Sequence, residues 1–444
     1  MNKLVIYSLL VSLVQLVFSS LKAQDFKPLV EIAWQNNSLL KSKNFQLESA
    51  AYSLKEAKAM FGPDIKFGTQ YTLAQGGRSI DFPVGDLLNP VYNTLNLITQ
   101  TNSFPQISNV HEKFLPNNFY DARFRISQPV FYPDLAINQK LKSETIKLKD
   151  LEIKAFKRQI SRDVMSAWFQ MDLADNANDI YLAAETLLGE AKRTTQSLIR
   201  NGVALPSALS RIETQLADIL AHQIEAKTNV RNAAMYLRFI LGVDENVGLP
   251  EMTDIPDLPT IPPDPAMERE EIKQIKQSMA LQNLSLEKDN AYFKPRISAQ
   301  LDVGSQDFDF GLQPYALIGL NVEFNIYDSN RHKYRKDAVK ADIMASNAQM
   351  NHVSNQMTLL VNTSKANLIS ALKQADTYYS RINDTKKIYE EVLKKYKEGI
   401  VGYLELLDAQ TQVTQTELQH LVARNNAWLR WVEYIYATAT FHIE

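Results

Sequence analysis

The residues of this chain whose types and spacing most suggest a functional site are two carboxylates, Glu405 and Asp408. They lie three residues apart in the first turns of a helix-prone segment, and residues at i and i+3 share one face of a helix. If several copies of the chain met at this point, the carboxylates would surround a constriction and attract cations. The alternative is that they are ordinary first-turn acids, which interact favourably with the helix dipole.

The rest of the sequence offers no catalytic, metal-binding or cofactor-binding arrangement. Its six histidines are scattered without a ligand spacing such as HExxH. There is no cysteine, which excludes disulfides, thiolate ligands and cysteine nucleophiles. No phosphate-binding loop, GxSxG or GxGxxG motif occurs, and the net charge of −2 is not that of a nucleic-acid-binding protein. We therefore predict no enzyme, no metal, no cofactor and no nucleic-acid partner.

A glycine-centred turn positions the acidic pair. Residues 396–412 read YKEGIVGYLELLDAQTQ, and Gly399 stands where the end of a helix needs a residue with positive φ. The chain is therefore expected to follow one helix, turn tightly and return along another. A second turn of this kind is predicted at Gly202, with Pro206 where the next helix starts.

Long segments almost free of helix breakers lead into these turns. Residues 134–200 contain no proline and only one glycine, and as a single helix they would extend about 100 Å. A helix of that length exceeds one globular core and should pack along other helices. We predict long helical hairpins over residues 134–241 and 329–440.

Four segments alternate apolar and polar residues, which predicts β-strands with one face of each kind. They span about residues 63–73, 119–130, 295–304 and 315–327. Residues 74–117 are rich in Gly, Asn, Ser and Pro and are interpreted as a long loop of unassigned role. The charged residues of the polar strand faces are Lys66, Arg123, Arg125, Asp302 and Glu323.

The same order of helix, strand, loop, strand, long helix, turn and helix occurs twice. Gly202 and Gly399 are offset by 197 residues, and so are Leu209 and Leu406. The repeats cover residues 24–241 and 266–444, and a proline-rich linker, residues 242–265, joins them. Such agreement is typical of an internal duplication.

Residues 1–23 have the pattern of a secretory signal peptide, with Lys3, an apolar stretch and Ala23 at the expected cleavage point. A retained membrane anchor is the alternative, although the apolar stretch is short for a spanning helix. No later stretch approaches 20 apolar residues, so strands would have to make any membrane crossing of the mature chain.

Four strands cannot close a barrel, and open strand edges are not tolerated in a membrane. Partner chains would be needed, with eight strands from two copies or twelve from three. The polar strand faces would then line a watery lumen. The alternative on pattern alone is a sheet packed on a helical bundle in an exported, soluble coiled-coil protein with a structural or adhesive role.

The duplicated plan, Gly62-Pro-Asp-Ile65, and Tyr396-x-x-Gly399 followed by Leu406-Leu-Asp-Ala-Gln410 resemble the TolC-like outer membrane efflux family over nearly the whole mature chain. The resemblance implies a mainly α-helical fold with membrane β-strands. It implies a homotrimer whose twelve-stranded barrel lies in outer-membrane lipid of a Gram-negative-type cell and continues as an α-helical barrel through the periplasm. It also implies a passive exit duct for drugs, metals or secreted proteins, joined to an inner-membrane transporter by a periplasmic adaptor.

The resemblance assigns roles to the two turns as well. Residues 201–206 and 399–404 would be the periplasmic tips, and the loops between strands would face outside the cell. Glu405 and Asp408 match an acidic pair that surrounds the tunnel mouth. We expect this ring to come from the second repeat alone, because the first has other residues at these positions.

Tyr396 matches a tyrosine that helps to hold the family's tip closed. Two polar partners of that tyrosine are missing here, since Val401 replaces an arginine and Ala208 replaces an acidic residue. We therefore expect closure to rest on apolar contacts or on Arg200 and Arg211.

Overall fold

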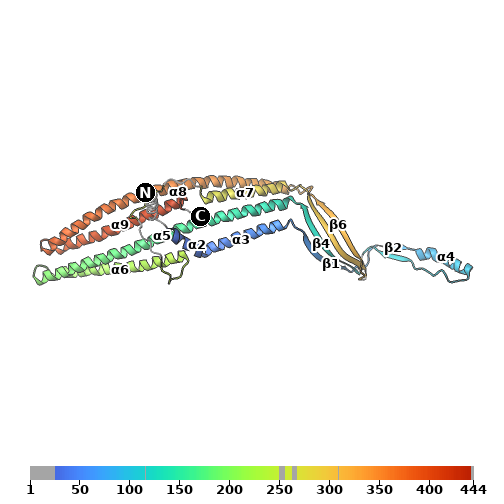
Figure 1. The fold of residues 1–444 in the computed structure, drawn as a ribbon, viewed down its shortest axis with the longest axis horizontal. Coiled ribbons are helices and arrows are strands. Elements are labelled where there is room, and N and C mark those ends of the chain that lie inside the picture. The colour runs from blue at the N-terminus through green and yellow to red at the C-terminus, as the bar shows by residue number, and fades with distance from the viewer. Residues whose placement is uncertain (1–25, 116, 250–255, 263–267, 309, 442–444) are drawn as a thin grey trace, which may run out of the picture. The chain divides into compact units, whose positions relative to one another are not determined.

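The computed structural model of the chain describes residues 26–115, 117–249, 256–262, 268–308 and 310–441. The expected signal peptide, residues 1–23, and parts of the proline-rich linker lie outside these residues. The chain divides into two compact units (Figure 1). The helical unit comprises Met1–Ala50, Glu144–Gln282 and Ala341–Glu444, and the sheet unit comprises Ala51–Ser143 and Asn283–Lys340. Each sequence repeat therefore contributes to both units.

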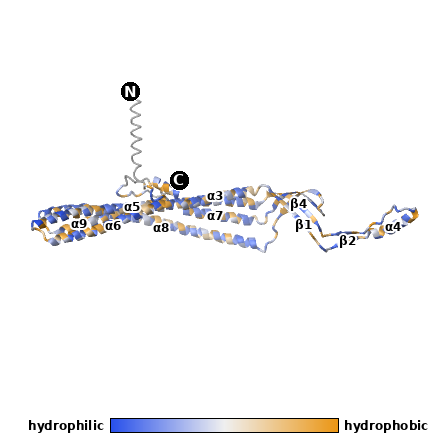
Figure 2. Cartoon of the chain, turned by 90° about the horizontal axis from the view of Figure 1, so that it is seen from below, coloured by the Kyte–Doolittle hydropathy of each residue, from blue (hydrophilic) through white to orange (hydrophobic). Residues whose placement is uncertain are grey.

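Long helices dominate the helical unit. Helices α5 and α6 lie side by side, as do α8 and α9 (Figure 1). Apolar residues are interspersed among predominantly hydrophilic ones along these helices (Figure 2). None of the helices in the described ranges combines the length and the apolar character needed to span a bilayer. The helices that run partly or wholly in this unit are α2 (Lys27–Asn36), α3 (Ser38–Ala59), α5 (Pro133–Arg200), α6 (Pro206–Leu241), α7 (Glu270–Asn290), α8 (Arg331–Lys397) and α9 (Tyr403–Thr438).

The duplication is visible in the helix ends. Helices α6 and α9 each have 36 residues and begin 197 positions apart, as the sequence offset predicts. Both end in a left-handed residue, Gly242 with φ 66° and Ala439 with φ 56°. A hydrophobic core in the helical unit joins α2 to α5 and α9. Its largest fully buried side chains include Phe26, Phe169 and Trp428.

The first repeat begins with two helices where the predicted order has one, because the chain breaks at Asn37 between α2 and α3. The backbone N–H of Asn37 donates to the carbonyl of Ala33 at 2.8 Å and ends α2. Its side-chain oxygen accepts the N–H of Leu40 at 2.9 Å and so caps the start of α3. The capping capacity of asparagine therefore outweighed the helical periodicity.

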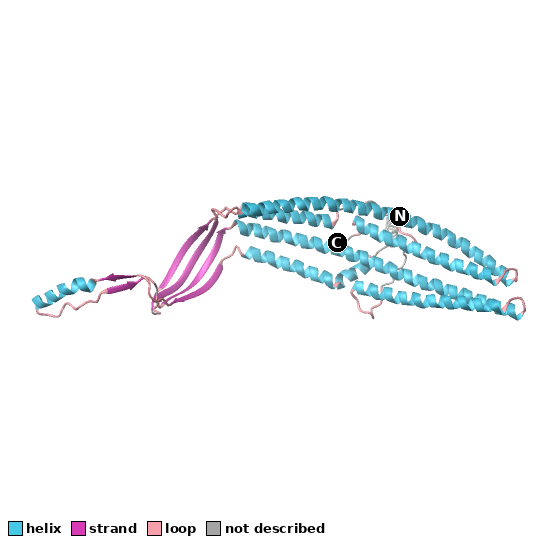
Figure 3. Cartoon of the chain, turned by 180° about the vertical axis from the view of Figure 1, so that it is seen from behind, coloured by secondary structure: helices cyan, strands magenta, loops and turns pink. Residues whose placement is uncertain are grey.

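The sheet unit contains a four-stranded antiparallel sheet in the order β1-β4-β5-β6, drawn as magenta arrows in Figure 3. Its strands are β1 (Asp64–Thr72), β4 (Phe119–Phe131), β5 (Arg296–Phe308) and β6 (Pro314–Glu323). Strand β6 ends at Glu323, short of the expected Tyr327. The edges β1 and β6 each pair with one strand only. The sheet is therefore open on both sides in a single chain.

Residues 74–117 are not the unstructured loop that their composition predicted. They form a two-stranded ribbon, β2 (Ser79–Phe82) with β3 (Val110–Lys113), and a helix, α4 (Val84–Thr99). Asn89 exchanges two hydrogen bonds of 2.9 Å with the backbone of Ile107, and Asn96 does the same with Phe104 at 2.7 and 3.0 Å. The asparagines that suggested a loop hold the returning chain against α4.

Candidate functional site

The turns between the long helices have the same backbone structure. Gly399 has a φ of 72°, as predicted for it, and Gly202 has a φ of 71°. In the second turn, the N–H of Gly399 donates to Tyr396 O at 3.0 Å and the N–H of Ile400 to Lys395 O at 2.9 Å. The first turn repeats both bonds 197 residues earlier. Both are Schellman motifs, which satisfy the last carbonyls of a helix and reverse the chain.

The two turns lie next to one another in the helical unit. A Cβ placed on Gly399 would be 3.5 Å from Cγ1 of Val203. Behind the turns is an apolar group that we call the tip cluster, and Val401 packs against it. The cluster draws on all four long helices, so it joins the two hairpins. Its buried members are Ala191, Ile212, Tyr389, Val392, Tyr396, Leu406, Ala409 and Val413.

Tyr396 makes the polar contact inside this cluster. Its side chain is 3% exposed, and its hydroxyl lies 2.6 Å from the hydroxyl of Thr195. Thr195 donates its own proton to the carbonyl of Ala191 at 2.8 Å, so we infer that Tyr396 is the donor in the pair. Sequence reasoning identified Tyr396 but missed Thr195, because a lone threonine inside a helix has no motif around it.

The two missing polar partners are replaced by packing. Ala208 is fully buried at the start of α6, and Val401 is partly buried on the tip cluster. Arg200 and Arg211 are exposed, and neither forms an ion pair with any residue that the structure describes. Near the turns of one chain, the hairpins are therefore joined by apolar contacts and the Tyr396–Thr195 pair. What holds the tip closed stays a prediction.

Glu405 and Asp408 are both exposed on α9. The face they share lies beside that of Leu406 and Ala409, which enter the tip cluster. The predicted common face is therefore present, whereas a ring of carboxylates needs further copies and stays a prediction. Position 208, the counterpart of Glu405 in the first repeat, is buried and unsuited to a carboxylate.

A lysine near the acidic pair escaped the sequence analysis. Lys395 donates to Glu391 at 2.7 Å. The pKa of Lys395 is raised by that hydrogen bond and by the charge of Glu391, with a smaller contribution from Glu405. The negative field of Glu405 is therefore partly compensated within its own chain. The sequence feature that could have identified Lys395 is its position in the last helical turn before Gly399.

The sheet separates its polar and apolar residues by face. The register aligns Lys66, Arg125 and Asp302 across three strands, and places Arg123 and Glu323 on the same side. On the opposite face Phe67, Phe124 and Val303 align, and large exposed side chains continue across it. All five residues predicted for the lumen therefore share one polar face. Whether that face lines a lumen stays a prediction.

Charge pairing organises the polar face. Arg125 donates from Nε to Oδ1 of Asp302 at 2.8 Å and from Nη2 to Oδ2 at 2.7 Å, a two-point contact. Gln300 also donates to Asp302, whose side chain is buried, at 2.9 Å. Arg123 pairs with Asp121, whereas Lys66 pairs with Asp64 in an exposed position. The described part of this face is thus polar and close to neutral.

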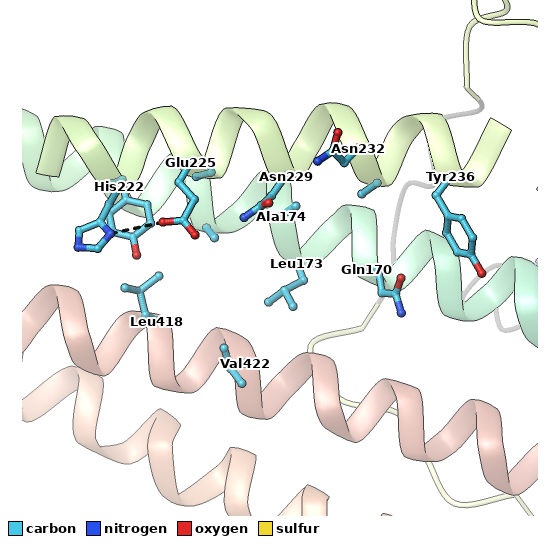
Figure 4. A pocket seen from close by; sticks show the side chains of 14 residues that line it. Gln170, Leu173, Ala174, His222, Glu225, Asn229, Asn232, Tyr236, Leu418 and Val422 are labelled. Atoms are coloured by element: carbon cyan, nitrogen blue, oxygen red, sulfur yellow. Dashed lines mark ion pairs between the residues drawn. The ribbon is translucent and has the colours of Figure 1, made fainter. Parts of the chain in front are cut away.

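A groove of about 650 Å³ lies in the helical unit between the α5–α6 hairpin and α9 (Figure 4). Its walls carry Leu173 and Asn229 from the first hairpin and Leu418 from α9. The His222 Nδ1 and Glu225 Oε2 atoms are 3.9 Å apart at one end. Among the described residues, no group of histidines and acids is arranged to hold a metal ion. We interpret the groove as a helix-packing surface.

Residues 268–433, most of the second repeat, match the family described as outer membrane efflux protein. No curated protein matches the chain.

Solved structures match the fold over nearly the whole chain. The outer membrane protein VceC of Vibrio cholerae has a TM-score of 0.69 and 13% identity, covering 93% of this chain and 95% of its own. The outer membrane channel CmeC of Campylobacter jejuni has a TM-score of 0.70 and 15% identity, covering 94% and 85%. The outer membrane channel MtrE of Neisseria gonorrhoeae has a TM-score of 0.68 and 15% identity, covering 93% and 88%. These similarities establish the fold.

Proposed function

We propose that this chain, a member of the outer membrane efflux protein family, is the exit duct of a tripartite efflux or secretion system. The protein resides in the outer membrane and extends into the periplasm. It conducts substrates passively, since the energy comes from a transporter in the inner membrane that is joined to it through a periplasmic adaptor.

The observation that carries this proposal is the exposed apolar face of the four-stranded sheet. Phe67 is 62% exposed and Ile318 85% exposed, and Phe124, Leu320 and Val322 on that face are also exposed. An apolar sheet face of this extent is unfavourable in water and favourable against lipid. The opposite face carries paired charges, which suit a watery lumen.

The open edges of the sheet argue for several copies. Strands β1 and β6 leave backbone groups unpaired, and a bilayer offers no water to satisfy them. We propose that β1 of one copy pairs with β6 of the next, so that three chains form one barrel of twelve strands. The helical hairpins of the three copies would then form the α-helical barrel.

The second turn supplies the narrow inner mouth in this account. Three copies of Glu405 and Asp408 place six carboxylates around the entrance, which favours cations over anions. Tyr396, Gly399 and Gly202 belong to the tip that opens and closes. The adaptor and the pump approach the chain from this end.

Membrane fractionation with unboiled gels tests the proposal. We expect the chain in the outer-membrane fraction, running as a trimer when unheated and as a monomer after boiling. A monomer in the soluble periplasmic fraction would contradict the channel proposal and favour the exported coiled-coil alternative.

A further inference from the structure

Helix α4 presents a regular apolar stripe that nothing in the described chain covers. Leu87 is 69% exposed and Ile98 is 74% exposed. The stripe follows a spacing of three and four residues, which is the spacing of a coiled-coil seam. Its apolar members are Val84, which is half-buried, and the exposed Leu87, Val91 and Ile98, with the exposed Thr94 completing the spacing.

The opposite face of α4 is already occupied. Asn89 and Asn96 bond the backbone of the returning segment, and Asn93 accepts a hydrogen bond of 2.6 Å from Gln106. These three asparagines point away from the stripe on a helical wheel. The returning chain therefore fixes which side of α4 stays free, and the free side is the apolar one.

The composition of α4 does not suit a membrane surface. Helices that lie in the lipid interface carry lysine and arginine on their polar face and often tryptophan on the other. Helix α4 has neither basic residues nor tryptophan, and its one charged residue, Asp86, bonds to Asn109 at 2.9 Å. A stripe with heptad spacing and no charge is instead suited to pack against the same stripe on α4 of another copy of the chain.

We propose that the α4 helices of neighbouring copies pack on one another through this stripe, forming a three-helix cap over the outer end of the channel. The inference rests on the proposed trimer. The ribbon β2–β3 that carries α4 is connected through residues 73–78 and 114–118 to β1 and β4. The cap would thus continue the interface in which β1 takes part.

The connection is long enough for the helices to meet. Twelve strands spaced about 4.8 Å apart and tilted by about 40° enclose a barrel of radius about 12 Å. The segment of residues 73–83 bends at Gly76 and Gly77, but its fully extended length is about 36 Å at about 3.3 Å per residue, well above that radius. Each copy can therefore bring its α4 to the axis of the channel.

The absence of native cysteine makes cross-linking a clean test. Leu87→Cys and Ile98→Cys, introduced separately, would be oxidised in intact cells and analysed on non-reducing denaturing gels. We expect each variant to shift into disulfide-linked dimers, up to two of every three chains, since three clustered cysteines form one bond. The matched control is Asn93→Cys on the opposite face, which should stay monomeric.

Unboiled gels of the same samples separate failure of the cap from failure of the channel. If the trimer is present but both seam variants stay monomeric on the denaturing gel, the cap is wrong and the channel proposal stands. The same conclusion follows if Leu87→Cys does not cross-link and is also shielded from a membrane-impermeant maleimide, since another molecule then covers the stripe. If no trimer exists, both proposals fail.

Discussion

The hydroxyl of Tyr396 lies 2.6 Å from the hydroxyl of Thr195, and both side chains are buried where the two hairpin turns meet. This contact joins α8 to α5. It is the polar part of an otherwise apolar junction, which makes it the natural first target for testing how the tip is held.

Thr195→Val should lower the free energy of local opening at the tip by about 1–3 kcal/mol, because it leaves the Tyr396 hydroxyl buried without a partner. Hydrogen exchange of the peptides around residues 191–203 and 389–402 would report the loss as faster local opening. The double variant with Tyr396→Phe should be closer to the wild type, since both partners are then apolar. Equal opening in the single and double variants would refute the coupling.

Glu405→Gln together with Asp408→Asn should lower the cation selectivity of single channels, because the carboxylate ring loses its charge. The measurement is the reversal potential in a salt gradient. Glu390→Gln serves as the control, since it removes an exposed carboxylate from α8 away from the turn. An unchanged reversal potential in the double variant would show that the acids are ordinary helix-start residues. If Tyr396→Phe is added to this double variant and the single-channel conductance stays unchanged, the assignment of Tyr396 to the gate is also wrong.

Asp302→Asn should shift the selectivity of the channel toward anions, because it leaves the charge of Arg125 uncompensated on the polar face. Arg125→Gln alone should shift it the opposite way. The double variant restores neutrality and should return close to the wild type in the same reversal-potential measurement. If none of the three variants changes selectivity, this face does not line the conducting path.

Glu270→Gln should destabilise the helical unit by about 3–5 kcal/mol, since it breaks a buried pair with Arg158. Arg158 donates to both carboxylate oxygens, at 2.9 and 2.8 Å, and to the carbonyl of Phe441. Thermal unfolding followed by circular dichroism would measure the loss. Glu433→Gln, which opens the exposed pair with Arg430, should cost no more than about 1 kcal/mol.

The same pair predicts a pH dependence of stability. Burial acts to raise the pKa of Glu270, but the hydrogen bonds and charge of Arg158 outweigh it, so the pKa is lowered on folding. A lowered pKa means that the stabilisation is present in full above the ordinary glutamate pKa of about 4.3 and is lost as pH falls below it. Unfolding curves of Glu270→Gln should show a weaker acid dependence than the wild type. If the unfolding free energies of the variant and the wild type depended on pH in the same way, the stabilising role of the Glu270 carboxylate would be contradicted.

The strands and long helices could be predicted because their periodicities run without interruption over many residues. The turns could be predicted because positive φ at Gly202 and Gly399 leaves glycine as the natural choice. The break at Asn37 and the fold of residues 74–117 could not, since asparagine side chains there form bonds that depend on which backbone lies opposite.

The candidate site divides in the same way. Tyr396, Glu405 and Asp408 were found from local spacing and family resemblance. Thr195 was missed because the fold brings its partner Tyr396 near. Lys395 was missed because its main contact, with Glu391 four residues earlier, is an ordinary pair on one helix face.

The central claim is that three copies of the chain close the open sheet into one outer-membrane channel. Native mass spectrometry of protein extracted in detergent from the outer membrane tests it most directly. The account predicts a mass of three chains. A mass of one or two chains, from protein whose helical content is intact, would contradict it.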